Sequence, residues 1–167
     1  MRGYQIMNIW IVNLKSNGLS TTDEMKADYI KSNTCGMGWR LNENITSKNE
    51  YLNKAVVTWP EEEKSLTLAC NNYHKMAKND LVLTRVATHY YIGIVADDKP
   101  FYDISNNICP NNISSWMRKV TWYLIGNQDV TPAPIVAQLS SRHQKTIDIR
   151  LPWNKVLYDF CKVVCNN

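Results

Sequence analysis

The 167-residue sequence lacks the short motifs that mark the common nucleotide-dependent and hydrolytic enzymes. It contains no GxxxxGK[ST] loop, no GxGxxG turn, no HExxH zinc motif and no GxSxG nucleophile elbow. Its histidines, His74, His89 and His143, are far apart in the sequence, and we interpret each as a surface or core residue rather than a catalytic base. These absences predict a non-catalytic protein that needs no cofactor.

The sequence also lacks paired cysteines and long apolar runs. Its five cysteines are odd in number and form no CxxC motif, which favours free thiols over a disulfide framework. Cys161 and Cys165 lie one helical turn apart, but no histidine follows at the spacing of a zinc ligand. The apolar run 9–12 is far too short to cross a membrane, and no signal-peptide core follows Met1. We therefore expect a cytoplasmic protein that binds neither a metal nor a membrane.

Tryptophan and tyrosine are abundant: the chain has six Trp and nine Tyr but only two Phe. Their side chains combine a π-face with a polar group, which suits both wet interfaces and base stacking. We interpret Trp10, Trp59, Trp122 and Trp153 as core or helix-packing residues, while the residues alone leave Trp39 and Trp116 open between core and pocket wall.

The net charge of +4 permits an anionic partner without requiring one. Several basic residues lie near aromatic residues in the sequence, an interleaving that fits a nucleic-acid surface, although an ordinary solvated face is the alternative. The cations that we expect to contact phosphates around the mouth of a pocket are Arg40, Arg118, Lys119, Arg142 and Lys145. We expect the acidic run Glu61–Glu63 on the far side of the molecule.

Hydrophobic periodicity and capping residues predict a chain that mixes short strands with helices. Strands are expected over residues 4–14, 35–41, 80–85, 90–95, 119–125 and 146–149. Helices are expected over residues 21–32, from 47 to about 56, 60–77, 132–139 and 152–164. The capping boxes are Thr21 with Glu24 and Ser47 with Glu50. Residues 97–115 have the composition of a long loop, and such loops are often functional.

Six short motifs, taken in their order, resemble the PUA-like superfamily, and most closely its EVE and YTH-like domains. They are Ile9-Trp10-Ile11-Val12, Gly36-Met37-Gly38-Trp39, Met76-Ala77-Lys78-Asn79-Asp80-Leu81-Val82-Leu83, Tyr91-Ile92-Gly93-Ile94-Val95, Arg118-Lys119-Val120-Thr121-Trp122 and Arg142-His143-Gln144-Lys145-Thr146-Ile147. The order is similar to that of the EVE-like modules at the N-terminus of McrB-type restriction proteins. One position departs from the family pattern, because Asn79 stands where glycine usually precedes the aspartate.

The resemblance implies an α+β fold: a PUA-like, EVE-like twisted open β-barrel flanked by helices. We expect five or six strands, with Trp10, Ile92 and Val120 facing the barrel interior and Asp80 as a structural turn acid. Residues 1–150 would form the base-recognition domain. Residues 151–167 would form an amphipathic helix that packs on this domain or links it to a further segment.

The resemblance also implies a function, the recognition of a flipped base in an aromatic pocket. By position, Trp39 matches the family's first pocket aromatic, and the candidates for the second are Trp116, Tyr102 and Trp122. The expected partner is DNA with a modified base, above all a methylated one. The base would be read for a modification-dependent restriction system whose motor and nuclease lie on other segments or subunits. The alternative is an RNA-binding PUA-like module that acts on tRNA or rRNA.

Overall fold

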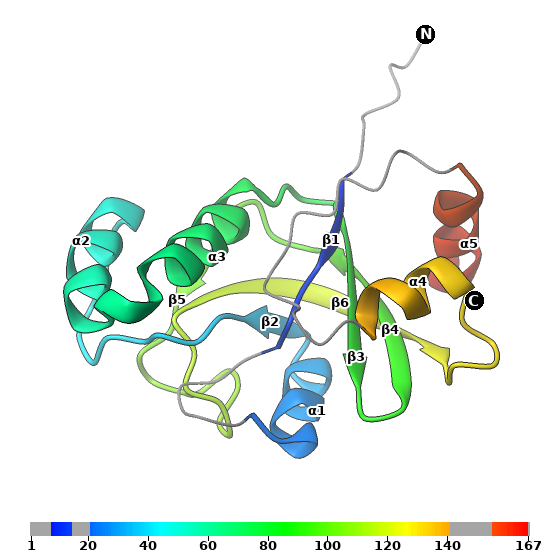
Figure 1. Ribbon diagram of the computed structural model, residues 1–167, viewed down its shortest axis with the longest axis horizontal. Coiled ribbons are helices and arrows are strands. Elements are labelled where there is room, and N and C mark those ends of the chain that lie inside the picture. Colours follow the sequence, from blue (N-terminus) through cyan, green and yellow to red (C-terminus); the bar gives the residue numbers. More distant parts are fainter. Residues whose placement is uncertain (1–7, 15–20, 141–154, 167) are drawn as a thin grey trace, which may run out of the picture.

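The computed structural model describes residues 8–14, 21–140 and 155–166. These residues form a mixed β-sheet with helices on both of its faces (Figure 1). The strands are β1 (Ile9–Ile11), β2 (Thr34–Gly36), β3 (Leu81–Val86), β4 (His89–Val95), β5 (Phe101–Tyr102) and β6 (Trp116–Gly126). The helices are α1 (Asp23–Lys31), α2 (Lys48–Thr58), α3 (Glu63–Lys75), α4 (Ala133–Leu139) and α5 (Lys155–Asn166), and a 3₁₀ turn, η1 (Pro60–Glu62), precedes α3.

The sheet has the strand order β1-β3-β4-β6-β2, and β5 pairs with β6 off this path. Strand β1 runs parallel to β3, and the other pairings are antiparallel. The long strand β6 pairs with β2 and β5 through Trp116–Lys119 and with β4 through Val120–Gly126. Because one strand serves two sets of partners, the sheet curls into an open half-barrel flanked by helices. The expected α+β class and bent open sheet are confirmed at this level.

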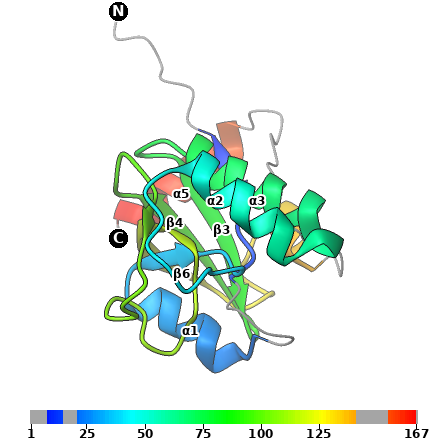
Figure 2. The same ribbon diagram turned by 90° about the vertical axis from the view of Figure 1, so that its left-hand side faces the viewer.

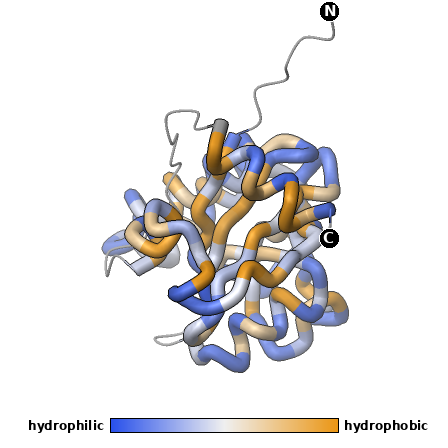
Figure 3. Tube along the Cα trace, turned by 90° about the vertical axis from the view of Figure 1, so that its right-hand side faces the viewer, coloured by the Kyte–Doolittle hydropathy of each residue, from blue (hydrophilic) through white to orange (hydrophobic). Residues whose placement is uncertain are grey.

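The two faces of the sheet bury separate hydrophobic clusters. Trp10 and Val120 belong to the first cluster, together with side chains from α1, α2 and α3. Ile92 belongs to the second cluster, where Ile135 of α4 and Leu157 of α5 cover the opposite face. In Figure 3 the hydrophobic positions run through the central strands. The expectation that Trp10, Ile92 and Val120 share one interior is therefore wrong for Ile92, because neighbouring strand residues alternate between the faces.

Helix starts follow the capping rules to within one residue. Ser47 is the N-cap of α2, where its hydroxyl accepts a hydrogen bond from the Glu50 amide at 3.1 Å. The N-cap of α1 is Thr22 rather than Thr21, and it accepts from the Met25 amide at 3.2 Å. Pro60 begins the 3₁₀ turn, as expected of a residue that lacks an amide hydrogen.

Strand ends differ more from the expectations. Strand β2 ends at Gly36, so residues 37–41 leave the sheet as an irregular segment instead of extending it. The loop 97–115 contains the short strand β5, whose pairing with β6 no local pattern signals. The expected strand at 146–149 lies outside the described residues.

Asp80 ties three elements together at the start of β3. Its carboxylate accepts hydrogen bonds from the Trp10 indole at 2.8 Å, the Ala77 amide at 2.9 Å and the Asn8 amide at 3.1 Å. The side chain is only 2% exposed. A buried carboxylate is tolerated where donors surround it, so Asp80 acts as the structural turn acid that the sequence predicted.

Candidate aromatic site

The segment after β2 turns sharply at Trp39, which adopts a left-handed backbone conformation with φ of 58°. This backbone conformation is unfavourable for a bulky residue, and it persists only where the surrounding structure fixes it. Two hydrogen bonds provide that restraint: the Tyr51 hydroxyl donates to the Trp39 carbonyl at 2.9 Å, and the Ser115 hydroxyl donates to the Gly38 carbonyl at 2.5 Å. The Trp39 side chain is half-buried against the first hydrophobic cluster.

Trp116, the first residue of β6, is the centre of a group of aromatic rings. Its ring centroid lies 4.5 Å from that of His74, 5.4 Å from that of Tyr102 and 6.1 Å from that of Tyr51, in edge-to-face geometries. These are the separations at which aromatic pairs attract each other. We call these four residues and Trp39 the aromatic site. Figure 2 shows α2 and α3, which supply Tyr51 and His74, lying across this end of the sheet.

The polar groups of the aromatic site are neutral. Burial raises the pKa of Tyr102 to about 12, and its hydroxyl donates to the Leu41 carbonyl at 3.0 Å. Burial also lowers the pKa of His74. Its Nδ1 lies 2.8 Å from the Cys70 carbonyl, which can only accept, so Nδ1 carries the proton and Nε2 is an acceptor in the neutral ring.

Trp116 contributes to the aromatic site a buried polar atom without a hydrogen-bond partner in the described part of the chain. The residue is 6% exposed, and its indole Nε1 has no hydrogen-bond partner among the described residues. Most buried donors in proteins are paired, and an unpaired one costs about 1–3 kcal/mol. The site therefore contains a donor that a bound acceptor would satisfy.

Glu62 lies beside Trp39, which corrects the expected charge distribution. Its Oε2 accepts a hydrogen bond from the Trp39 indole Nε1 at 3.0 Å. The expectation that Glu61–Glu63 lie on the far side from the pocket is wrong for Glu62, because the short turn η1 returns the chain towards Trp39. A carboxylate at this position disfavours a phosphate close to the exposed edge of Trp39.

Arg118 does not belong to any phosphate-contacting surface. The side chain is 0% exposed. Its Nε donates to Asp97 Oδ1 at 2.7 Å, its Nη2 to the Asp97 carbonyl at 2.9 Å, and its Nη1 to the carbonyls of Tyr73 at 2.9 Å and Met76 at 2.5 Å. The expected role of Arg118 is corrected: the guanidinium joins β6 to the end of α3 in the interior, so phosphates cannot reach it.

The remaining predicted cations are dispersed. Arg40 is 9% exposed, and its guanidinium donates to the Asn106 side chain in the long loop. Lys119 is exposed beside a hollow of about 330 Å³ that Ser32 and Thr121 also line. Arg142 and Lys145 lie outside the described residues. Among the described cations, the structure thus leaves Lys119 on the surface as expected and turns the other two inward.

Trp122 lies apart from the other pocket candidates. Its indole Nε1 donates to the Thr34 carbonyl at 2.9 Å, and it stands opposite Gly93 in the β4–β6 pairing. It lies six positions after Trp116 along β6, about 20 Å in an extended strand. The structure brings Trp116 and Tyr102 together and places Trp122 elsewhere on the sheet.

Sequence reasoning missed three residues of this region, Tyr51, His74 and Glu62. Tyr51 and His74 lie on helices whose periodicity only predicts an inward face, and Glu62 is fully explained by the start of a helix. Their convergence on Trp39 and Trp116 depends on packing between segments 12 to 65 residues apart, for which the sequence carries no local signal.

Two further properties of the described residues bear on function. Within residues 8–14, 21–140 and 155–166, no helix combines the length and the apolar character that a membrane crossing requires. The same residues bring no three side chains of His, Cys, Asp or Glu together in a group suited to a metal ion.

Comparison with known proteins gives a family but no described activity. A protein-family model described as a domain of unknown function, DUF8426, matches residues 10–148. No curated protein and no solved structure matches the chain. Because the matched region runs from β1 to beyond α4 and covers most of the sequence, the chain belongs to the DUF8426 family.

Proposed function

We propose that this chain is a non-catalytic, PUA-like module that recognises a modified base in DNA, with a methylated base as its ligand. In this proposal the aromatic site receives the base after it has been flipped from the duplex. The module would supply specificity to a modification-dependent restriction system, whose motor and nuclease lie on other segments or subunits.

The observation that carries the proposal is the convergence of Trp39, Tyr51, His74, Tyr102 and Trp116 at one end of the half-barrel. Trp39 presents a partly exposed ring from a constrained turn, as a stacking residue requires. The buried Trp116 Nε1 and the His74 Nε2 add one donor and one acceptor to the aromatic site.

One backbone feature also supports the PUA-like resemblance. Asn79, which replaces the family's usual glycine, has φ of 73°. Asparagine is among the non-glycine residues that tolerate this left-handed conformation best. The departure in sequence therefore keeps the backbone geometry that glycine would allow in front of Asp80.

The energetics of base flipping suit a site of this kind. Extruding a base costs a few kcal/mol in lost pairing and stacking. Stacking on an aromatic side chain returns about 1–3 kcal/mol, and burial of one methyl group adds about 0.8 kcal/mol. Discrimination by the methyl group alone would be modest, so the polar atoms of His74 and Trp116 would have to contribute to selectivity.

A binding panel tests the proposal. Fluorescence anisotropy should compare duplex DNA, single-stranded DNA and RNA, each with and without 5-methylcytosine, 5-hydroxymethylcytosine or N6-methyladenine. We expect tightest binding to one modified DNA. The Trp39→Ala variant should lose about 1–3 kcal/mol of that binding while it remains folded, since Trp39 is only half-buried.

The matched control is Tyr123→Ala, which truncates a half-buried aromatic on the opposite face of the sheet. It should leave binding unchanged. Tightest binding to RNA would transfer the proposal to the RNA-binding alternative. A folded Trp39→Ala variant that binds every member of the panel like the wild type would refute the aromatic site. If Trp39 is instead a core residue, its truncation should cost about 3–5 kcal/mol of stability and lower the melting temperature.

A further inference from the structure

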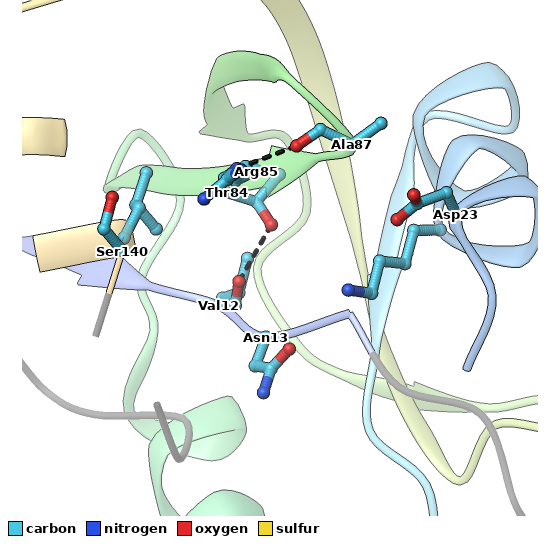
Figure 4. Close-up of a pocket in the computed structure, with 9 residues that line it drawn as sticks. Val12, Asn13, Asp23, Thr84, Arg85, Ala87 and Ser140 are labelled. Carbon is cyan, nitrogen blue, oxygen red and sulfur yellow. Dashed lines mark hydrogen bonds between the residues drawn. The ribbon is translucent and has the colours of Figure 1, made fainter. Parts of the chain in front are cut away.

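A polar hollow of about 370 Å³ opens between α1, the end of β1, the β3–β4 hairpin and the end of α4. None of the residues that line it belongs to the aromatic site. In Figure 4, Asp23 stands on one side of the hollow, with Thr84 and Arg85 of β3 across from it and Ser140 at the other end. The hollow therefore joins segments that come from distant parts of the sequence.

Arg85 presents a preorganised guanidinium at this hollow. Its Nε donates to the Ala87 carbonyl at 2.7 Å, and the group lies 5.6 Å from the centroid of the Tyr90 ring. Both contacts restrain the planar fork, so less freedom is lost when it binds a ligand. Within the described part of the chain, its two Nη atoms have no hydrogen-bond partner, and their donors remain available.

Lys26 provides a second cation from the opposite side, on α1. Its side chain is half-buried, and among the described residues no carboxylate forms an ion pair with it. Asp23 also lines the hollow and offsets part of this charge. Two cations against one carboxylate leave the described lining with a net positive charge.

From this arrangement we propose that the hollow binds the phosphate group of a small ligand or of a nucleic-acid chain. A phosphate accepts hydrogen bonds from a guanidinium fork and from an ammonium at the same time, and these charge-assisted bonds are stronger than neutral ones. The exposed Ser140 at the edge of the hollow adds a hydroxyl donor. This site does not depend on the function proposed for the aromatic site.

An NMR titration of the ¹⁵N-labelled full chain tests the proposal. Inorganic phosphate, pyrophosphate and a short unmodified single-stranded DNA serve as separate probes at constant ionic strength. We expect saturable shifts of amides in α1 and the β3–β4 hairpin, with pyrophosphate binding more tightly than phosphate. Saturation by the DNA alone would identify the backbone of a nucleic acid as the source of the phosphate.

Charge variants locate the site. Lys26→Gln should weaken binding about tenfold, because one charged hydrogen bond is lost. Asp23→Asn should strengthen it, since a repulsive charge disappears. The matched control is Lys31→Gln, which removes an exposed cation from the same helix outside the hollow. Lys26 is chosen over Arg85 because Arg85 also supports the hairpin.

Three results would overturn the proposal. The first is the absence of saturable shifts with all three probes. The second is equal affinity of the wild type and Lys26→Gln, and the third is an equal loss in Lys26→Gln and Lys31→Gln, which would indicate screening of the overall charge. Each of these outcomes leaves the aromatic site untouched, because the shifts are followed at α1 and the β3–β4 hairpin and the variants change residues outside that site.

Discussion

Replacing Arg118 with methionine should destabilise the protein severely without changing its fold. Methionine replaces the apolar stem of the arginine but is shorter and has no donor, so four hydrogen bonds to Asp97, Tyr73 and Met76 are lost at once. The interior keeps the acceptors of those bonds. An acceptor that stays buried without a donor costs about 1–3 kcal/mol, and breaking a buried ion pair costs about 3–5 kcal/mol in total.

The structure places the expected loss at about 3–4 kcal/mol, in the lower part of that range. Asp97 is 15% exposed, so water reaches its carboxylate, and its Oδ2 keeps a hydrogen bond from the Lys119 amide at 2.8 Å. For a chain of this size each kcal/mol lowers the melting temperature by about 2–4 °C. A decrease of roughly 6–16 °C should follow.

Urea denaturation followed by circular dichroism measures the effect, with Lys119→Met as the control. Lys119 is the exposed neighbour on the same strand, and its replacement should change stability by less than about 0.5 kcal/mol. The Arg118→Lys variant should fall between the two, because an ammonium cannot reproduce the fork. A loss below about 1 kcal/mol in Arg118→Met would refute the view that this residue holds β6 to α3.

Two further predictions concern packing and pH. Gly93→Ala should destabilise the fold by about 1–3 kcal/mol in the same urea assay, because the new Cβ would lie 2.3 Å from Val120 Cγ1. A loss of stability below about 0.5 kcal/mol would contradict this prediction. The Thr46 amide and hydroxyl, together with Lys54, lower the pKa of Glu50 to about 2. Because the folded pKa lies below the unfolded one, the stabilisation from Glu50 is present above about pH 4.5 and is lost as the pH falls towards 2. A carboxyl NMR titration of Glu50 with a midpoint near 4.5 would count against these hydrogen bonds.

The sequence predicted correctly those elements that are determined by residues within one helical turn or one hairpin. The Ser47–Glu50 box and Pro60 marked helix starts that depend on nearby backbone donors. The β3–β4 hairpin followed from two apolar runs separated by a short turn. In these cases the residues that decide the structure are neighbours in the sequence.

The burial of Arg118 follows from strand alternation, although its charge led to the prediction of a surface position. Along a strand every second residue shares a face, so Arg118 lies on the same side of β6 as Val120. The alternation therefore predicts that Arg118 points inward, but a buried charge is stable only where other segments of the chain supply hydrogen-bond partners. Those partners come from α3 and the segment after β4, and their positions depend on the whole fold.

The aromatic site was predictable only in part for a similar reason. Trp39, Trp116 and Tyr102 could be selected by residue type and by their places at element boundaries. Their neighbours Tyr51 and His74 looked like ordinary core positions of two helices. The charge beside Trp39 was misjudged because a 3₁₀ turn, rather than the helix itself, positions Glu62.

The division of the hydrophobic interior by the sheet has a consequence for how substitutions combine. Residues in separate packing units, without shared partners, contribute to stability almost additively. Changes to the cluster under α4 and α5 should therefore alter the free energy of unfolding without transmitting repacking to Trp39 and Trp116. That face can acquire stabilising substitutions, or a spectroscopic label on exposed Val163 of α5, while the opposite face keeps the geometry of the aromatic site.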